Sequence, residues 1–452
     1  MKRGILIALL IVAICITPAF AASNSEVKKP VAKNIIVMIA DGRGFNHLTS
    51  ASYYAYGKPD FQTYARFPFR FAMSTYEAYP AGHLCYGRGY DPQLAWSDFE
   101  WVKECFTDSA AAATAMATGV KTLDGVIGMD ANLQPVTNVV EVAERHGKAT
   151  GVITTVAFNH ATPAGFVAHN VSRNNYLALA AEEVDLSAVD VVMGAGNPYY
   201  TDDNMPRPPK FQYISQPTWD SLVAGTAGAD SDGDGLADPW TLIQTRAEFQ
   251  SLASGPTPER VFGMAQVAST LQQSRSGDAF ALPFVVPFNQ GVPTLEEMTK
   301  AALNVLDNDP DGLFLMVEGG ATDYAAHSNQ SGRLIEEHLD FDAAVQAVID
   351  WVQANSNWGE TLLVVTNDHE TGYLWGPGSD PDWLPIVNNG EGNLPGMAWF
   401  STEHTNSLVP IFAKGDAGRM LSRFAVNHDP VRGPYLDNTD LGKLLFWTID
   451  PQ

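Results

Sequence analysis

The chain has 452 residues, and its 51 Asp and Glu outnumber its 27 Lys and Arg, which gives a formal net charge of −24 at pH 7. A nucleic-acid-binding protein needs a basic face that displaces counterions from phosphates, and docking on an anionic membrane also needs positive charge. The composition therefore argues against both classes. With 45% hydrophobic residues the chain can bury a large core, which excludes a disordered protein.

The amino terminus has the pattern of a secretory signal peptide. Two basic residues precede an apolar run from Ile5 to Ile16, and small residues follow at positions 18–21. The run is short for a membrane-spanning helix, although a membrane anchor is the alternative. We expect residues 1–22 to be removed on export and residues 23–452 to form the mature protein, in the periplasm or outside the cell. No second long apolar stretch predicts membrane insertion after cleavage.

Removal of the signal peptide leaves two cysteines, Cys85 and Cys105. Two cysteines in an oxidising compartment most simply pair. The disulfide bond would close a loop of about 20 residues and stabilise the fold by about 3 kcal/mol. Two free buried thiols are the alternative.

Continuous apolar runs alternate along the chain with helical stretches. The runs have the character of strands buried on both faces of a sheet, and they are Asn34–Ala40, Gly151–Thr155, Val189–Gly194, Leu313–Val317, Thr361–Thr366 and Val409–Ala413. The expected helices are Ala110–Thr118, Val136–His146, Leu295–Leu306, which Thr294 and Glu297 would cap, and Leu334–Ala354. This alternation predicts an α/β fold, a three-layer αβα sandwich with a large, mostly parallel central sheet.

Two segments interrupt this alternation. Residues 197–256 are rich in Pro, Asp and Gly, and residues 371–395 are rich in Gly, Pro and Trp. We expect both to be long surface insertions in one catalytic domain.

Acidic and histidine side chains follow several predicted strands. Ligands bind at the carboxyl ends of the strands in such a sheet, so we expect these side chains to meet at one edge. Asp and His together suit zinc, while carboxylates and hydroxyls suit magnesium. A lone Asp-Gly is usually a turn and a lone Asp-His pair is usually on the surface, but their joint occurrence indicates a metal site. The residues are Asp41, Glu318, Asp323, His327, Asp368, His369 and His404.

Ser109 stands where a helix of small residues begins. An N-cap serine is the simpler interpretation of this position taken alone. The free N–H groups and the positive end of the helix dipole also suit a phosphate group or an ionised serine.

Together these motifs resemble those of the alkaline phosphatase family, in the family's order along the chain. The resemblance runs from about Asn34 to about Phe446. It implies the fold of that family and hydrolysis of phosphate monoesters through a phosphoserine on Ser109, with release of inorganic phosphate. The matching motifs are Asp41-Gly42, Asp108–Ala111 with Ala113–Ala115, Ala161–Ala164, Ser172-Arg173, Val317–Gly319, Asp323 with His327, Asp368-His369 and Glu403–Thr405.

The resemblance also implies two zinc ions and one magnesium ion. Two zinc ions roughly 4 Å apart can stabilise the attacking and leaving oxygens of a displacement at phosphorus. Arg173 would bind two phosphate oxygens through its planar guanidinium, and Asp108 would orient it. The first zinc would take Asp323, His327 and His404; the second would take Asp41, Asp368, His369 and, exchangeably, Ser109; the magnesium would take Asp41, Thr162 and Glu318.

Three positions depart from the family's pattern. The bacterial type has Asp where His160 stands and Lys where Tyr324 stands, and the animal type has His at both. We expect both side chains to lie near the substrate phosphate. The combination of His160 with Tyr324 leaves the affinity of the third metal site open, because His160 lies two residues from Thr162. Arg43 stands where Met is common, and a surface or salt-bridge arginine is the default expectation.

The other histidines match no ligand position, and we expect them to be structural or on the surface. His83 is the least certain, because it lies inside the cysteine loop near Ser109. They are His47, His83, His146, His169, His338 and His428.

An acidic stretch, Asp230, Asp232, Asp234 and Asp238, has the alternating carboxylates of a calcium loop. The glutamate that completes an EF-hand loop is missing, since Thr241 stands in its place. A solvated acidic turn is the alternative, and a weak structural Ca²⁺ site is the favoured interpretation in an exported protein.

Two other functions stay open: a phosphodiesterase or sulfatase of the wider superfamily, and an inactive exported calcium-binding scaffold. Arg173 and Ser109 favour the monoesterase, because the second substituent of a diester would crowd the arginine. The presence of every metal ligand argues against an inactive protein. We expect small phosphate monoesters as the partners and no nucleic acid. A homodimer is compatible with the resemblance, since many relatives are dimers.

Overall fold

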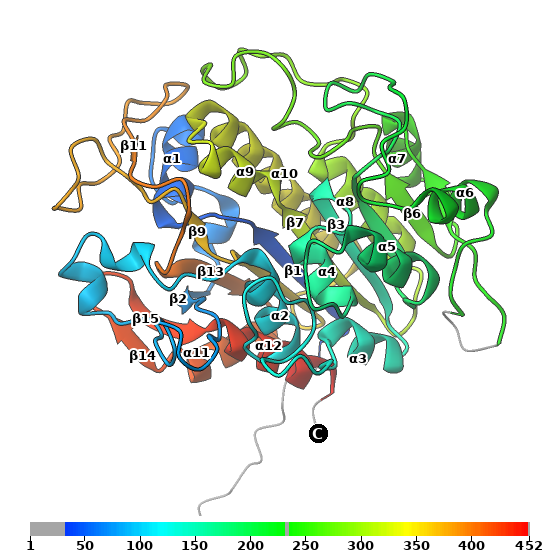
Figure 1. The fold of residues 1–452 in the computed structure, drawn as a ribbon, viewed down its shortest axis with the longest axis horizontal. Coiled ribbons are helices and arrows are strands. Elements are labelled where there is room, and N and C mark those ends of the chain that lie inside the picture. The colour runs from blue at the N-terminus through cyan, green and yellow to red at the C-terminus, as the bar shows by residue number, and fades with distance from the viewer. Residues whose placement is uncertain (1–31, 231–234, 451–452) are drawn as a thin grey trace, which may run out of the picture.

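The computed structural model describes residues 32–230 and 235–450, and a single large sheet runs through them (Figure 1). The sheet has 11 strands in the order β14-β15-β2-β13-β8-β1-β7-β3-β4-β6-β5. Its strands are β1 (Asn34–Ala40), β2 (Phe69–Ser74), β3 (Ala149–Ala157), β4 (Val191–Ala195), β5 (Thr241–Ile243), β6 (Val261–Met264), β7 (Leu313–Gly319), β8 (Thr361–Thr366), β13 (Val409–Lys414), β14 (Asn427–Asp429) and β15 (Gly433–Asp437).

The seven strands from β8 to β5 are parallel to one another, whereas β13 is antiparallel to both of its neighbours, β8 and β2. Strand β1 lies at the centre, where Ile36 is level with Leu315 on β7 and with Leu363 on β8. Every residue of β1 is buried. The predicted mostly parallel sheet is therefore confirmed.

Helices cover both faces of the sheet, because alternate residues of each central strand point to opposite sides. Ile35 and Val37 of β1 pack in one core and Ile36 and Met38 in the other. The first core includes residues of α2 (Ser109–Thr118), α3 (Val139–Arg145), α4 (Ala161–Val167), α5 (Tyr176–Asp185), α6 (Gln216–Ala224) and α12 (Asn438–Ile449). The second includes residues of α1 (Phe45–Tyr56), α7 (Arg246–Leu252), α8 (Leu295–Leu306) and α10 (Ser331–Asn355). The three-layer fold follows from this division.

Helix boundaries follow the capping residues. The capping box of Thr294 and Glu297 begins α8 as predicted. Helix α3 begins three residues later than expected, because Asn138 accepts a hydrogen bond from the Glu141 N–H while the Glu141 carboxylate accepts one from the Asn138 N–H.

Segment 197–256, expected to be a surface insertion, also contributes to the core. It contains α6 and α7, and β5 forms one edge of the central sheet. Trp219 and Phe249 from these helices are buried. Segment 371–395 runs mainly through loops at the left of Figure 1, where β10 (Leu374–Trp375) pairs with β11 (Ala398–Trp399).

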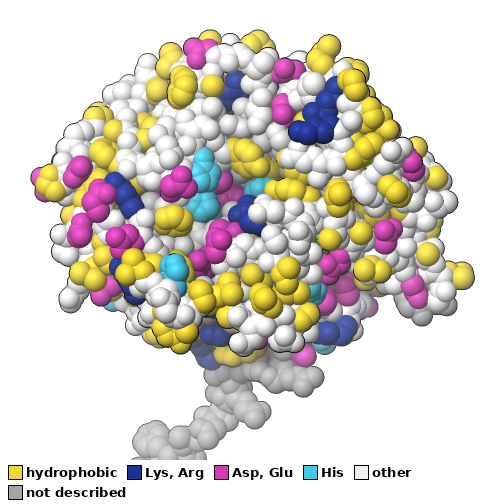
Figure 2. All heavy atoms as spheres, in the orientation of Figure 1, with side chains coloured by type: hydrophobic (Ala, Val, Ile, Leu, Met, Phe, Trp, Pro, Cys, Tyr) yellow, Lys and Arg dark blue, Asp and Glu magenta, His cyan; other side chains and the backbone are white. Residues whose placement is uncertain are grey.

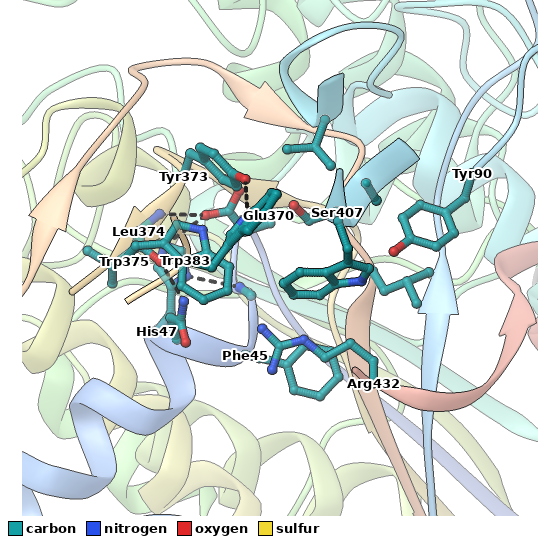
Figure 3. Close-up of a pocket in the computed structure, with 16 residues that line it drawn as sticks. Phe45, His47, Tyr90, Glu370, Tyr373, Leu374, Trp375, Trp383, Ser407 and Arg432 are labelled. Atoms are coloured by element: carbon teal, nitrogen blue, oxygen red, sulfur yellow. Dashed lines mark hydrogen bonds and ion pairs between the residues drawn. The ribbon is translucent and has the colours of Figure 1, made fainter. Parts of the chain in front are cut away.

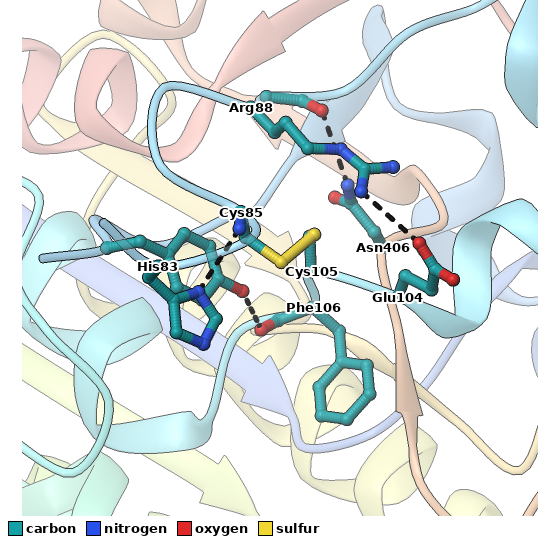
Figure 4. The surroundings of a disulfide bond; sticks show 9 residues. His83, Cys85, Arg88, Glu104, Cys105, Phe106 and Asn406 are labelled. Carbon is teal, nitrogen blue, oxygen red and sulfur yellow. Dashed lines mark hydrogen bonds and ion pairs between the residues drawn. A yellow bond between two sulfur atoms is a disulfide. The ribbon is translucent and has the colours of Figure 1, made fainter. Parts of the chain in front are cut away.

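Cys85 and Cys105 form the predicted disulfide bond, with their Cα atoms 5.5 Å apart (Figure 4). The bond closes the loop that leads into Thr107, Asp108 and α2. Within the described ranges no helix combines the length and apolar character needed to span a membrane. The predicted signal peptide, residues 1–22, lies outside the described residues.

Candidate active site

The acidic and histidine residues meet at the carboxyl ends of the central strands. The register places Glu318 of β7 and Thr366 of β8 on either side of Ile39, two residues before Asp41. Histidine, acidic and basic side chains gather near the centre of the face shown in Figure 2. A cavity opens among these strand ends, and it is lined by Ser109, His160, Arg173, Asp323, Tyr324, His327, Ser328 and His404.

The first predicted zinc site brings together Asp323, His327 and His404, whose ligand atoms lie within 4.8 Å of one another. Asp323 and His327 are one turn apart on α9 (Ala321–His327), which puts them on the same side of the helix. His404 comes from β12 (His404–Thr405), which pairs with β9 (Glu370–Thr371). Two short elements from distant parts of the chain, α9 and β12, therefore supply this group, and β9 supports β12.

Hydrogen bonds orient both histidines of this group. His327 Nδ1 lies 2.5 Å from the Thr402 carbonyl oxygen, and His404 Nδ1 lies 2.8 Å from the Thr107 carbonyl oxygen. A carbonyl can only accept, so each Nδ1 carries a proton and each Nε2 faces the other, 3.0 Å away. Two Nε2 lone pairs repel at that distance, so either a shared proton or a cation must lie between them. The geometry thus fits a metal ion.

The carboxylate of Asp323 affects how strongly His327 holds a proton. It therefore influences whether a proton or a metal ion lies between the two Nε2 atoms at a given pH. Although burial lowers the pKa of His327, the hydrogen bond and charge of Asp323 raise it to about 9. Burial would raise the pKa of Asp323, but His327, His404 and His369 hold it well below its usual range. Below pH 9 a metal ion must therefore displace a proton from this group.

The second predicted zinc site is formed around His369 Nε2. This atom lies 3.5 Å from Asp41 Oδ1, 3.1 Å from Asp368 Oδ2 and 3.2 Å from Ser109 Oγ. Thr371 Oγ1 donates to Asp323 Oδ1 at 2.6 Å, so it accepts from His369 Nδ1, 3.2 Å away. The Nε2 lone pair of His369 consequently points at the two carboxylates and the serine.

The carboxylates of this second group are buried without donors. Both oxygens of Asp41 and Oδ2 of Asp368 receive no hydrogen bond from the described residues. Burial raises the pKa of Asp41, as do the neighbouring carboxylates, first Asp368; burial likewise raises the pKa of Asp368 to about 6. Buried carboxylates of this kind are costly unless a cation is bound.

The predicted magnesium ligands Asp41 and Glu318 lie together, and His160 joins them within 4.8 Å. Burial raises the pKa of Glu318 to about 7, while the hydroxyls of Thr154 and Thr162 act in the opposite direction. Burial, followed by the charge of Arg173, lowers the pKa of His160 to about 3, so the ring is neutral. This third group therefore offers two carboxylates, the Thr162 hydroxyl and an imidazole.

Ser109 is the first residue of α2, and Asp108 is its N-cap. Asp108 Oδ1 accepts from the Ala111 N–H at 2.9 Å. The interpretation of Ser109 as an N-cap is therefore wrong, because Asp108 takes that place and Ser109 Oγ turns toward His369. Asp108 Oδ2 also accepts from Arg173 Nη1 at 2.8 Å, and so it orients the arginine.

Tyr324 and His160 line the cavity beside Arg173. Arg173 Nη2 and the Tyr324 hydroxyl both lie 3.3 Å from His160 Nε2. Burial, and then the neighbouring Tyr213, raise the pKa of Tyr324 above its usual value, so the phenol stays neutral. Position 324 therefore presents a neutral hydroxyl to the cavity.

Glu77 is a supporting residue that no motif in the sequence indicates. Its Oε2 accepts from the Asp108 N–H at 3.3 Å, and its carboxylate lies near those of Asp108 and Asp124. Burial, followed by the charge of Asp108, raises the pKa of Glu77 to about 9. Glu77 and Asp108 are 31 residues apart, so only the fold reveals their contact.

Replacing Glu77 with glutamine is expected to make the free energy of unfolding less dependent on pH. Between pH 4.5 and about 9 the folded chain keeps the Glu77 proton and the unfolded chain loses it. Because the folded state then binds more protons, wild-type stability falls as the pH rises through this window. The stability of Glu77→Gln relative to the wild type should therefore increase with pH in urea unfolding. A pH-independent difference between Glu77→Gln and the wild type would contradict the prediction.

Beside the candidate metal-ligating residues lies a second pocket with aromatic walls (Figure 3). Glu370, directly after His369, borders this pocket and accepts hydrogen bonds from Thr405 Oγ1 and from the Leu374 N–H. The Thr405 bond joins β9 to β12, which carries His404. Arg432 packs over the Phe45 ring at 4.2 Å on the pocket's other side. Glu370 thus supports the strands beside two metal ligands, a role that its position after Asp-His could have suggested.

The remaining histidines lie outside the three ligand groups. His47 and His338 are fully buried, and His169 pairs with Glu182. His83 stacks on Tyr79 at 4.8 Å beside the disulfide bond, where its Nδ1 accepts from the Cys85 N–H (Figure 4). Each of these contacts gives the histidine a structural role.

The acidic loop is only partly described. Asp232 and Asp234 lie outside the described residues, and Asp230 Oδ2 accepts from the Gly235 N–H at 2.9 Å. A Ca²⁺ site formed by Asp230, Asp232, Asp234 and Asp238 therefore stays a prediction.

Comparison with known proteins identifies the family. A family model described as alkaline phosphatase matches residues 32–393. The chain therefore belongs to the alkaline phosphatase family.

Individual relatives agree with this assignment. The chain is 28% identical over 420 residues to the alkaline phosphatase of Escherichia coli K12, which covers 87% of this chain and 83% of the relative. It is 31% identical over 359 residues to alkaline phosphatase 3 of Bacillus subtilis, which covers 78% of this chain. The matches span 64% and 52% of the lengths of Bacillus subtilis alkaline phosphatases 3 and 4.

Solved structures share the fold. The alkaline phosphatase of the Antarctic bacterium TAB5 has a TM-score of 0.62 at 23% identity and covers 93% of this chain and 98% of its own. The Thermus thermophilus alkaline phosphatase has a TM-score of 0.63 at 20% identity and covers 95% of this chain and 94% of its own. A histidine-to-aspartate variant of the TAB5 enzyme has magnesium bound in its M3 site.

Proposed function

We propose that this protein is a metal-dependent phosphate monoesterase that acts through a phosphoserine on Ser109 and releases inorganic phosphate. The observation that carries the proposal is the convergence of lone pairs from His369 and two buried carboxylates beside Ser109 Oγ. Arg173 borders the same cavity and supplies a site for an anion.

The residues fit two zinc ions and one magnesium ion. Asp323, His327 and His404 would hold one zinc, and Asp41, Asp368 and His369 would hold the other, with Ser109 as its exchangeable ligand. Asp41, Thr162 and Glu318 would hold magnesium. Support comes from the orientation of each imidazole by its Nδ1 hydrogen bond and from the buried oxygens of Asp41, Asp368 and Glu318 that lack a donor.

The chemistry needs few protein groups. Bound metal ions would lower the pKa of a serine hydroxyl and stabilise the leaving oxygen. Ser109 Oγ forms a bond to phosphorus while the bond between phosphorus and the leaving alcohol breaks. Water then attacks the phosphoserine, which releases phosphate and restores the hydroxyl. Among the described residues, the side chains of Asp108 and His160 contact two of the five N–H donors of Arg173, which leaves donors for phosphate oxygens.

Phosphodiesters and sulfate esters are the alternative substrates. We infer that the monoester is preferred, because Arg173 is held in place by Asp108 at the wall of the cavity, where a second ester substituent would crowd it. We also propose that the protein is exported, on the strength of the amino-terminal pattern and the disulfide bond.

Release of nitrophenol from its phosphate monoester, its phosphodiester and its sulfate ester tests these proposals. We expect fast release from the monoester, slow release from the other two, and loss of all activity after treatment with a chelator. A faster diester reaction would favour the phosphodiesterase. No activity after zinc and magnesium are added would favour an inactive scaffold.

Replacing Tyr324 with lysine is expected to strengthen inhibition by inorganic phosphate. Tyrosine offers one neutral hydroxyl, whereas a lysine beside Arg173 and His160 would add a positive charge near the phosphate. The inhibition constant for phosphate should fall, most clearly below the pKa of the lysine. Tyr324→Phe serves as the control for loss of the hydroxyl, because it keeps the ring and adds no charge. An inhibition constant for Tyr324→Lys equal to or above the wild-type value would show that position 324 does not face the phosphate.

A further inference from the structure

Arg43 is fully buried directly behind the metal-ligand groups, with no exposed surface. It follows the turn Asp41-Gly42. The expectation of a surface or salt-bridge arginine is wrong, since the described residues include no ion pair to its guanidinium and solvent does not reach it. A buried cation that reaches a carboxylate, Asp342, through the Tyr64 hydroxyl rather than by a direct ion pair needs another explanation.

The guanidinium of Arg43 connects parts of the chain that carry different metal ligands. Nε donates to Asn367 Oδ1 at 2.5 Å, and Nη1 donates to the Tyr64 hydroxyl at 2.8 Å. Asn367 directly precedes Asp368 and is itself fixed, because its Nδ2 donates to the Pro410 carbonyl at 2.8 Å. The planar fork therefore reaches from the β1 turn to the end of β8.

The contacts of Arg43 continue to helix α10. Its guanidinium packs over the Phe341 ring at 4.8 Å, and the Tyr64 hydroxyl donates to Asp342 Oδ1 at 2.5 Å. Both Phe341 and Asp342 belong to α10, which packs beside α9 with its ligands Asp323 and His327. One side chain thus links three elements around the site.

Two hydrogen bonds hold the Asp41 turn against the Asp368 turn. On the ligand side, the Gly42 N–H donates to Asp368 Oδ1 at 3.0 Å. On the buried side, Arg43 Nε donates to Asn367. We propose that Arg43 is a positioning residue that fixes the separation of these turns, so that Asp41, Asp368 and His369 converge on one metal ion. The inference rests on the proposed function, because it takes that group to hold zinc.

Arg43 could position the metal ligands or could simply stabilise the fold, and its contacts distinguish these two roles. Its Nη2 has no partner among the described residues, so hydrogen bonds offset its burial only in part. Burying a charge without a directly paired counter-charge costs free energy, so an apolar side chain of similar size removes that cost, although it leaves Asn367 Oδ1 without its donor. Loss of a group that orients metal ligands typically weakens metal binding about 10- to 100-fold. Arg43→Met should therefore loosen zinc much more than it changes the stability of the metal-free chain.

The test compares zinc retention in zinc-loaded wild type and Arg43→Met. We expect both proteins to bind zinc, and we expect the variant to lose one zinc ion to a competing chelator about 10- to 100-fold faster. Arg43→Lys keeps the charge but loses the fork, so it should behave like Arg43→Met. Tyr64→Phe removes one acceptor and should give a smaller increase, and the double variant Arg43→Met/Tyr64→Phe should match Arg43→Met alone.

Arg260 provides the matched control. It is 1% exposed, packs over the Trp240 ring at 3.9 Å and donates to the carbonyls of Ser187 and Val189, near the amino ends of β4 and β6. Arg260→Met should leave the rate of zinc loss unchanged. Wild-type zinc retention in Arg43→Met, or equal loosening by Arg260→Met, would overturn the proposal. If Arg43→Met does not fold, the rate of zinc loss from Tyr64→Phe tests the proposal instead. Faster loss than from the wild type would support the positioning role of Arg43, and an unchanged rate would overturn it. Wild type that binds no zinc would instead refute the proposed metal centre.

Discussion

Replacing Ser109 with alanine is expected to lower kcat for a phosphate monoester by at least about 1,000-fold while the metal ions stay bound. Ser109 Oγ lies 3.2 Å from His369 Nε2, and no other hydroxyl of α2 faces this group. The remaining ligands of both proposed zinc sites are carboxylates and imidazoles that the substitution leaves in place. Alanine suits a helix that already contains a run of alanines, so the fold should persist.

The matched control for this substitution is Ser328→Ala. Ser328 lines the same cavity but is exposed, and its variant should keep most of the activity. Phosphate transferred from a labelled monoester should remain covalently attached to the quenched wild type and be absent from Ser109→Ala. Near-normal turnover by Ser109→Ala, or label trapped on another residue, would refute the phosphoserine.

Which of Asp108 and Ser109 caps α2 could not be predicted from the sequence. Aspartate and serine are both good N-caps, so the order Asp108-Ser109 does not say which residue begins the helix. The backbone of Asp108 is extended, with φ −97° and ψ 169°, and its carboxylate takes the capping bond. This leaves the serine hydroxyl free to face the metal ligands.

The strands that the sequence predicted share one property, a continuous apolar run. Such runs mark strands that are buried on both faces, as β1, β7 and β8 are. Strands β14 and β15 at the sheet edge are short and partly exposed, so they carry no run that could be recognised. Strand β5 is also short and partly exposed and carries no such run. For this reason segment 197–256 was not predicted to contribute a strand to the sheet.

The ligand groups could be predicted because their order along the chain matches a family, whereas the residues that support them could not. Arg43 and Asn367 are 324 positions apart, and Glu77 reaches Asp108 across 31 positions. Neither pair carries a local pattern. Their roles depend on which turns the sheet brings side by side, and that is a property of the folded chain.

Replacing His404 with alanine is expected to remove one zinc ion and most of the activity. The first site would keep only Asp323 and His327, which leaves zinc under-coordinated. The Thr107 carbonyl would also lose its hydrogen bond from His404 Nδ1. Elemental analysis of the purified protein should give one zinc fewer per chain than in the wild type. Asp323→Asn should also remove one zinc ion and most of the activity, because it removes the charged ligand of this site.

His146→Ala is the control for loss of an imidazole, since its side chain is 41% exposed and lies near Asp450, away from the ligand groups. It should keep the full zinc content and activity. In the wild type, zinc should be held less tightly as the pH falls below 9, because His327 then carries a proton that zinc must displace. An active wild type without zinc would contradict the assignment of this site, and so would a His404→Ala variant that keeps its full zinc content.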